Sequence, residues 1–199
     1  HYSIPESYGA DVDILQLRPE NGFLPNLAEL KAMVRPETKL IVLNNPNNPT
    51  GALMEAEALD AFVAIARSCD AFVLCDEVYR GTNQIGDGFA PAMADVYEKG
   101  ISVAGMSKTF SLAGLRLGWI AAPLDVLEAV SIHRDYNTIS VGMLDDYFAA
   151  MALETKDKIL ARSQQITRGN LAILDAWVAD EPSMSYVKPQ SRHDCTVEI

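Results

Sequence analysis

Short apolar runs alternate along this chain with longer segments whose apolar residues recur at helical spacing. The runs are nearly continuous, as strands are when both faces of a sheet are covered. The predicted strands are residues 12–17, 39–43, 71–75, 101–105 and 117–121. The predicted helices are residues 26–34, 55–69, 124–134, 141–154 and 156–180. This alternation favours an α/β fold with three layers, in which helices cover both faces of a mainly parallel sheet.

The composition excludes several classes of protein. The chain has 199 residues, 49% of them hydrophobic, which is enough for a substantial core and too apolar for a disordered chain. Its net charge of −11 argues against binding nucleic acid, which attracts clustered Lys and Arg. No apolar run approaches the roughly 18 residues of a membrane helix, and no signal peptide pattern opens the sequence. Cys69, Cys75 and Cys195 show no paired spacing, which favours a reducing, cytoplasmic location and predicts no metal site.

Polar motifs follow three of the predicted strands. "NNPNNPTG" follows Leu43, "CDEVYRG" follows Leu74 and "AGMSKTFSLAGLRLGW" follows Val103. The carboxyl ends of parallel strands meet at one edge of a sheet, and α/β folds bind ligands there. The sequence therefore predicts that an asparagine, an aspartate, a tyrosine, a lysine and an arginine gather at this edge.

Each of these side chains, taken alone, has a commoner structural role. An asparagine in a proline-rich turn usually shapes the turn, and an aspartate after a strand is usually a cap or a surface charge. A lone tyrosine usually packs, and a lone lysine or arginine is usually a solvated or paired charge. Their shared placement at strand ends is what favours a functional site.

Together the three motifs resemble those of the class I/II aminotransferases, which are fold-type I enzymes dependent on pyridoxal 5′-phosphate (PLP). They occur in the family's order and at similar separations, and the resemblance runs from the start of the chain to about Pro189. It implies the large domain of that fold, in incomplete form, with PLP as the cofactor. The implied reaction transfers an amino group between an amino acid and a 2-oxo acid.

The resemblance also implies roles for five residues. Lys108 would be the catalytic lysine, which forms the Schiff base with the cofactor and then moves the substrate α-proton. Asp76 would keep the pyridine nitrogen protonated, and Asn48 and Tyr79 would hydrogen-bond the phenolic oxygen. Arg116 would bind the phosphate with its forked donors. The proline-rich turn would thus fix one asparagine over the cofactor.

One position departs from the family pattern. Three residues before the catalytic lysine, the family often has a serine that binds phosphate, and this chain has Gly105. The backbone N–H of Gly105 and the hydroxyl of Ser111 are the two candidates for the missing contact.

The resemblance covers the central part of a family member. The family's N-terminal part normally supplies another phosphate loop and a stacking aromatic residue, and its small domain supplies the arginine that binds the substrate carboxylate. We therefore expect a portion of a longer enzyme, inactive alone and homodimeric when intact, with Arg134 as a weaker candidate for substrate contact. The expected division is residues 1–155 for the PLP-binding large domain, 156–180 for an interdomain helix and 181–199 for a truncated small domain.

Two other functions stay open from the sequence. A PLP-dependent carbon–sulfur lyase shares the fold and the cofactor residues. Some transcriptional regulators carry an aminotransferase-like sensor domain behind a DNA-binding module. Either enzyme would act on small molecules, an amino acid and, for the aminotransferase, a 2-oxo acid, and neither needs nucleic acid or a membrane as a partner.

The tail, residues 191–199, differs from the family, which continues here into a turn such as "GTT" and an apolar strand. A change of reading frame after Pro189 would explain the difference, because codons for "QSRHDCTVEI" read "QSGTTALLK" after the loss of one C. On this hypothesis the tail has no evolved packing partner. An ordinary divergent terminus is the alternative.

Overall fold

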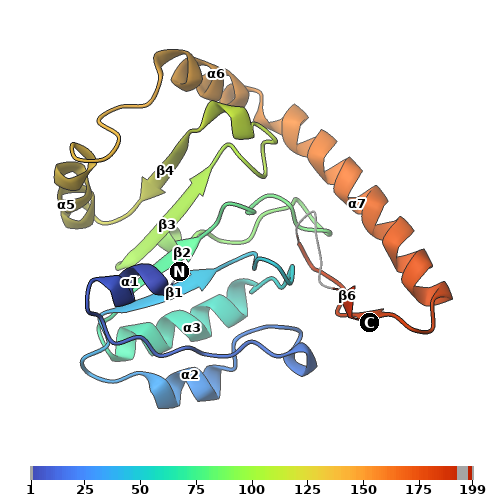
Figure 1. Ribbon diagram of the computed structural model, residues 1–199, viewed down its shortest axis with the longest axis horizontal. Coiled ribbons are helices and arrows are strands. Elements are labelled where there is room, and N and C mark those ends of the chain that lie inside the picture. The colour runs from blue at the N-terminus through green and yellow to red at the C-terminus, as the bar shows by residue number, and fades with distance from the viewer. Residues whose placement is uncertain (1, 192–196, 199) are drawn as a thin grey trace.

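A four-stranded sheet forms the centre of the computed structural model, which describes residues 2–191 and 197–198 (Figure 1). The strands lie in the order β1 (Leu40–Asn44), β2 (Phe72–Asp76), β3 (Gly100–Gly105) and β4 (Gly118–Ala121). The pairs β1–β2 and β2–β3 are parallel, and β3–β4 is antiparallel. This mainly parallel sheet with helices packed on it confirms the predicted fold class.

The long helices agree with the helical periodicity of the sequence. They are α2 (Leu27–Met33), α3 (Ala56–Ser68), α5 (Leu124–Arg134), α6 (Met143–Glu154) and α7 (Lys156–Asp180). The shorter elements are α1 (Ser3–Ser7), η1 (Pro19–Asn21), α4 (Met93–Val96), η2 (Ala113–Leu115), β5 (Ser185–Tyr186) and β6 (Val197–Glu198). As predicted, Asn26 caps α2, because its Oδ1 accepts hydrogen bonds from the backbone N–H groups of Ala28 (3.0 Å) and Glu29 (3.2 Å).

The strand predicted at residues 12–17 is wrong. The segment joins no sheet and instead packs beside the helices, where Leu15 contacts the main core and Ile14 is 51% exposed. An ion pair between Arg35 and Asp13 (2.7 Å) ties it to the end of α2. A short apolar run can thus be buried by helices without any strand partner, and its periodicity does not tell the two cases apart.

The two faces of the sheet differ in their cover. Val73 and Cys75 of β2 point into the main core, where they meet Leu59, Phe62 and Val63 of α3. The alternate side chains of the strands point to the opposite face, where Leu40 is 43% and Val42 is 37% exposed. The side chains of Asn44 and Asp76 belong to this second face, because the two residues are register partners there.

A second, smaller core supports the loop that follows β3. Met106 of that loop is fully buried against Ala149 and Ala152 of α6. From α6 the chain enters α7, which runs along one side of the molecule, and the red end of the chain then lies near the loops that follow β1 and β2 (Figure 1). Within the described residues, none of the helices combines the length and the apolar character that a bilayer span requires.

The tail expected to lack a packing partner begins with a well-packed residue. Ser191, the first residue of the tail, is 0% exposed. Residues 197–198 form β6, which pairs antiparallel with β5. Residues 192–196 and 199 lie outside the described part of the chain, and the hypothesis of a changed reading frame stays a hypothesis.

A buried carboxylate joins β2, β3 and α4. Glu77, which directly follows β2, is 4% exposed, and its Oε1 accepts hydrogen bonds from Ser102 Oγ (2.6 Å) and from Met93 N at the start of α4 (2.7 Å). Ser102 Oγ in turn accepts from Ala94 N (3.0 Å). Burial raises the pKa of Glu77, and the two hydrogen bonds oppose that rise only in part.

The raised pKa of Glu77 predicts a pH-dependent stability. Between the ordinary pKa of 4.5 and the raised pKa of the folded chain, the folded chain holds a proton on Glu77 that the unfolded chain has released, so this group's contribution to stability is lost as pH rises through the folded pKa. Glu77→Gln cannot ionise. We expect its free energy of unfolding, relative to the wild type, to increase as pH rises above 4.5, measured by urea unfolding at several pH values.

Glu57→Gln is the matched control, because Glu57 is exposed in the first turn of α3 and the change removes the same charge. An identical pH dependence of the two variants would contradict the assignment to Glu77.

Candidate active site

The three predicted motifs lie at the same edge of the sheet. The turn of Asn48 follows β1, Asp76 is the last residue of β2, and the loop of Lys108 follows β3. The register places Asn44 beside Asp76 and Asp76 beside Val103. Because all three strands run parallel, their carboxyl ends reach this edge together.

The asparagine-rich turn folds onto the end of β2 through its own side chains. Asn44 Nδ2 donates to the carbonyl oxygen of Asp76 (2.9 Å), and Asn44 Oδ1 accepts from Asn48 N (2.6 Å). The backbone N–H of Asn45 also donates to the Asp76 carbonyl (3.0 Å). The buried side chain of Asn45 bonds both backbone groups of Met54 and so closes the loop (3.0 and 2.8 Å). The side-chain amides of Asn44 and Asn45 thus form hydrogen bonds with backbone groups that the end of the strand leaves unpaired.

Asp76 and Tyr79 belong to the turn after β2. Asp76 Oδ1 accepts from Val78 N (3.1 Å), which orients the carboxylate toward its own turn. Tyr79 is 3% exposed. Lys108 Nζ lies 5.8 Å from the centroid of the Tyr79 ring, so the ammonium and the phenol come from different loops to one place.

Thr109 joins the loop of Lys108, here called the lysine loop, to the turn of Tyr79, here called the tyrosine turn. Its Oγ1 lies within hydrogen-bonding distance of the carbonyl oxygens of Val78 (3.1 Å) and Arg80 (2.9 Å), on either side of Tyr79. Thr109 is 2% exposed, so water does not compete for these bonds. The position of Lys108 relative to Tyr79 therefore depends on its neighbour in the sequence.

Arg116 lies at the end of η2, on the path from the lysine loop to β4. Its backbone is left-handed (φ 50°), its side chain is exposed, and its guanidinium donates to the carbonyl of Ala113 (2.8 Å). The backbone N–H of Met106 donates to Leu117 O (3.0 Å), which brings both ends of this loop together.

The close approach of β4 accounts for the glycine at position 105. Gly105 pairs with Gly118, and a Cβ added to Gly105 would lie 2.9 Å from the carbonyl oxygen of Leu117. Any side chain there would force the backbones apart. Ser111, the other candidate for a phosphate contact, is exposed, and its N–H donates to Lys108 O (2.9 Å).

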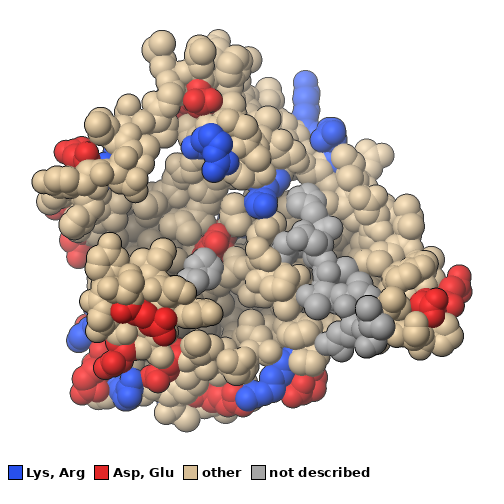
Figure 2. Space-filling model, viewed as in Figure 1, with Lys and Arg blue, Asp and Glu red and all other residues tan. Residues whose placement is uncertain are grey.

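The structure thus brings Asn48, Asp76, Tyr79 and Lys108 to one edge, with Arg116 on the adjoining loop. Figure 2 shows a hollow near the middle of the visible face, with an acidic side chain in it and basic side chains along its upper rim. Arg134 lies elsewhere: it ends α5, which follows the far end of β4. Two positioning side chains, Asn44 and Thr109, escaped the sequence analysis. The repeated asparagine was a signal for Asn44, whereas Thr109 had none.

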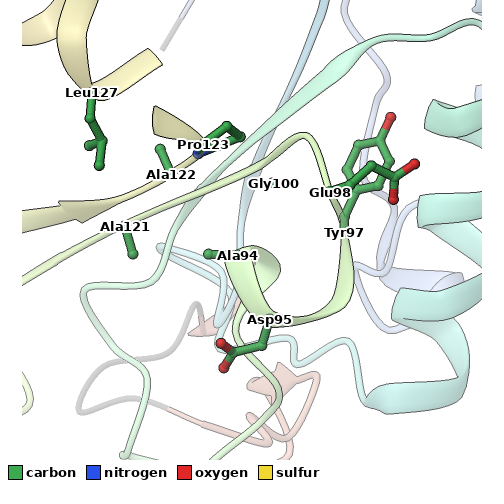
Figure 3. Close-up of a pocket in the computed structure, with 9 residues that line it drawn as sticks. All are labelled: Ala94, Asp95, Tyr97, Glu98, Gly100, Ala121, Ala122, Pro123 and Leu127. Atoms are coloured by element: carbon green, nitrogen blue, oxygen red, sulfur yellow. The ribbon is translucent and has the colours of Figure 1, made fainter. Parts of the chain in front are cut away.

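A cavity of about 430 Å³ lies at the opposite end of the strands (Figure 3). It is bounded by α4 on one side and by the end of β4 and the start of α5 on the other. Ala94, Gly100, Ala121 and Leu127 are among its lining residues, and the five candidate site residues are not. The candidate site is therefore the loop edge and not this cavity.

Comparisons with known proteins point to one family. The sequence pattern described as aminotransferase class I and II matches residues 1–191. Capreomycidine synthase of Streptomyces vinaceus is 31% identical over 171 residues, which are 86% of this chain and 44% of that protein. An aspartate/prephenate aminotransferase of Thermus thermophilus is 30% identical over 149 residues, which are 75% of this chain and 38% of that protein.

A solved structure shows the same likeness in three dimensions. The crystal structure of a PLP-dependent aminotransferase from Streptococcus suis matches with a TM-score of 0.90 and 46% identity, over 95% of this chain and 50% of that chain. The chain thus spans half or less of the length of these three proteins.

The geometry predicts that Asn44 positions the turn of Asn48. Asn44→Ala leaves Asp76 O and Asn48 N without their side-chain partner, which should lower the free energy of unfolding by about 1–3 kcal/mol. Amide hydrogen exchange in residues 45–51 should also become faster, as measured by mass spectrometry.

Asn137→Ala, in the exposed connection between α5 and α6, is the control and should change neither quantity. Equal exchange in both variants would show that Asn44 does not hold the turn.

Proposed function

Because the chain belongs to the family of class I and II aminotransferases, we propose that it is the cofactor-binding part of a PLP-dependent aminotransferase. The proposed reaction transfers an amino group between an amino acid and a 2-oxo acid. The observation that carries the proposal is the meeting of three turns at one sheet edge, with Lys108 Nζ 5.8 Å from the ring centroid of Tyr79. The names of the relatives favour neither a carbon–sulfur lyase nor a regulator.

The donor set at this edge fits the chemistry of PLP. The cofactor presents a ring nitrogen, a phenolic oxygen, an aldehyde and a phosphate. The carboxylate of Asp76 suits the protonated nitrogen, the donors of Asn48 and Tyr79 suit the oxygen, and the amine of Lys108 suits the aldehyde. The guanidinium of Arg116 suits the phosphate. Each polar group of the cofactor thus has a partner of complementary chemistry.

The proposed roles follow from the environment of each side chain. When bound, PLP supplies an electron-accepting ring that stabilises negative charge at the substrate α-carbon. Asp76, whose Oδ1 is oriented by Val78 N, would hold a proton on the ring nitrogen. Lys108 Nζ would take the proton from the substrate α-carbon. Tyr79 is 3% exposed. Its hydroxyl would donate a hydrogen bond to the phenolic oxygen of PLP, and its ring would keep water from that oxygen.

Arg116 can bind a phosphate without leaving η2. A guanidinium carries five N–H donors in a planar fork, and the hydrogen bond to Ala113 O engages one nitrogen, Nη1. We propose that the remaining donors bind the phosphate, assisted by the Gly105 N–H or the Ser111 hydroxyl.

The domain division, the assembly and the compartment are further parts of the proposal. Residues 1–155 would form the PLP-binding domain, 156–180 the interdomain helix and 181–199 the start of a small domain, and the bounds of α7 support the second of these. A homodimer is supported by large exposed apolar side chains on α5 and α6, among them Leu124, Ile132, Met143 and Tyr147. The free thiols of Cys69 and Cys75 support the cytoplasm.

Borohydride reduction with equimolar PLP tests the role of Lys108. We expect a phosphopyridoxyl group on Lys108, located by peptide mapping, and no label in Lys108→Ala. Lys156→Ala, at the exposed start of α7, is the matched control and should keep the label. A label that maps to a different lysine of the wild-type chain would transfer the role to that residue.

Asp76→Asn tests the carboxylate at the ring nitrogen. The amide can still accept the hydrogen bond from Val78 N, so the turn should persist, but the charge is lost. A charge-assisted hydrogen bond contributes about 1.5–3 kcal/mol, so the Kd for PLP should rise about 10- to 150-fold, measured by fluorescence titration. Asp60→Asn, exposed on α3, is the control. Equal affinities in the two variants would exclude Asp76 as the partner of the nitrogen.

A further inference from the structure

The chain returns to the candidate site after α7, through residues 189–191, here called the return segment. The backbone N–H groups of Gln190 and Ser191 both donate to the carbonyl oxygen of Gly51, each at 3.0 Å. Gly51 ends the turn that carries Asn48. In Figure 1, the red end of the chain accordingly lies beside the loop that follows β1.

Gly51 permits this contact because it has no side chain. Its φ is +70°, and a Cβ there would collide with Cβ of Pro189 and lie 2.7 Å from the carbonyl oxygen of Ser191. A left-handed backbone explains a glycine by itself, but the collision adds a second requirement that comes only from the return segment. The turn and the segment are therefore fitted to each other.

The same segment also bonds the loop that follows Tyr79. Gln84 N donates to Gln190 O (2.9 Å), and the hydroxyl groups of Thr82 and Ser191 are 2.9 Å apart. Ser191 Oγ also lies 3.4 Å from Asn83 Oδ1. Ser191 is 0% and Thr82 1% exposed, so these bonds form without competition from water.

Helix α7 supports the other side of this loop. Gln164 Nε2 donates to the carbonyl oxygens of Gly81 (3.2 Å) and Asp87 (3.0 Å). Arg168 Nη2 donates to those of Asn83 (3.0 Å) and Gly86 (2.9 Å). The loop of residues 81–88 is thus bonded to α7 on one side and to the return segment on the other.

We propose that the return segment positions Asn48 and Tyr79 relative to each other, and that Gln190 and Ser191 are positioning residues for the cofactor oxygen. Asn48 is three residues before Gly51, and Tyr79 is three residues before Thr82. Hydrogen bonds from both loops to one segment therefore restrict the motion of the two loops relative to each other. This inference rests on the proposed function, because it concerns the oxygen that Asn48 and Tyr79 would share. On this proposal, the chain beyond α7 is a structural part of the PLP site.

Coupling of this kind acts in both directions. If the return segment sets the two donors, then PLP bound by those donors should stabilise the return segment. The amides of Gln190 and Ser191 should therefore exchange more slowly with solvent when PLP is bound. A segment that merely covers the site from outside would gain no such protection through Gly51.

Hydrogen exchange on the full chain without cofactor tests the contact itself. Ser191→Ala removes one hydroxyl with little change of volume, and loss of a single neutral bond should speed exchange in residues 46–54 and 81–88 about 2- to 12-fold. Gly51→Ala should have a larger effect, because its side chain displaces the segment. Gly22→Ala is the matched control: its φ is also left-handed (+62°), but a Cβ there meets nothing within 4 Å. Exchange unchanged in Ser191→Ala, or equal in Gly51→Ala and Gly22→Ala, would overturn the contact.

A second measurement on the PLP-loaded chain tests the positioning role. Donors to the phenolic oxygen stabilise its anionic form, so their displacement should raise the pH midpoint of the cofactor's absorption change. We expect such a rise in Ser191→Ala and none in Gly22→Ala. Faster exchange with an unchanged pH midpoint would contradict the positioning role and leave the segment with a structural contact only. Failure of the wild-type chain to bind PLP would remove the proposed function and the positioning role with it, while the exchange experiment would still decide the contact.

Discussion

The carbonyl oxygen of Asp76 is the point on which the candidate site depends. It accepts hydrogen bonds from Asn44 Nδ2 (2.9 Å) and from the backbone N–H of Asn45 (3.0 Å), just where the regular pairing of β1 with β2 stops. Parallel strands leave such groups unpaired at their carboxyl ends, and a turn rich in asparagine supplies side-chain amides that complete them. The same bonds hold the turn of Asn48 at the end of β2.

The unequal cover of the sheet explains why the site can exist at this edge. One face carries the main core, in which Val73 and Cys75 pack on α3, and that face gives the strands their stability. Asn44 and Asp76 point to the other, less covered face, which spares the Asp76 carboxylate the desolvation cost of the main core. Glu77, one residue later, turns to the covered side, and burial raises its pKa there. The adjacent carboxylates of Asp76 and Glu77 thus belong to opposite faces of the sheet, and that of Glu77 has a structural role.

The loops at this edge are bonded to each other as well as to the sheet. Thr109 joins the lysine loop to the tyrosine turn, Asn44 joins the asparagine turn to β2, and Ser191 joins both turns to the chain beyond α7. A binding site made from loops needs such contacts, because the hydrogen bonds that order strands do not reach the loop tips. Membership of the aminotransferase family explains which side chains are presented, and these contacts explain how they are presented.

The sequence by itself determined the elements and residues that depend on local pattern. Helical periodicity predicted α7 as residues 156–180, the cap of α2 at Asn26 followed from its side chain, and the polar motifs marked the strand ends. The short apolar run at residues 12–17 was wrongly predicted as a strand, because such a run is equally suited to burial beside helices. Only the tertiary structure decided the antiparallel direction of β4, the need for glycine at position 105 and the bond of Ser191 to Thr82, 109 residues earlier. Contacts between distant segments are made by single residues that need no repeat along the chain, so one sequence carries no periodic signal for them.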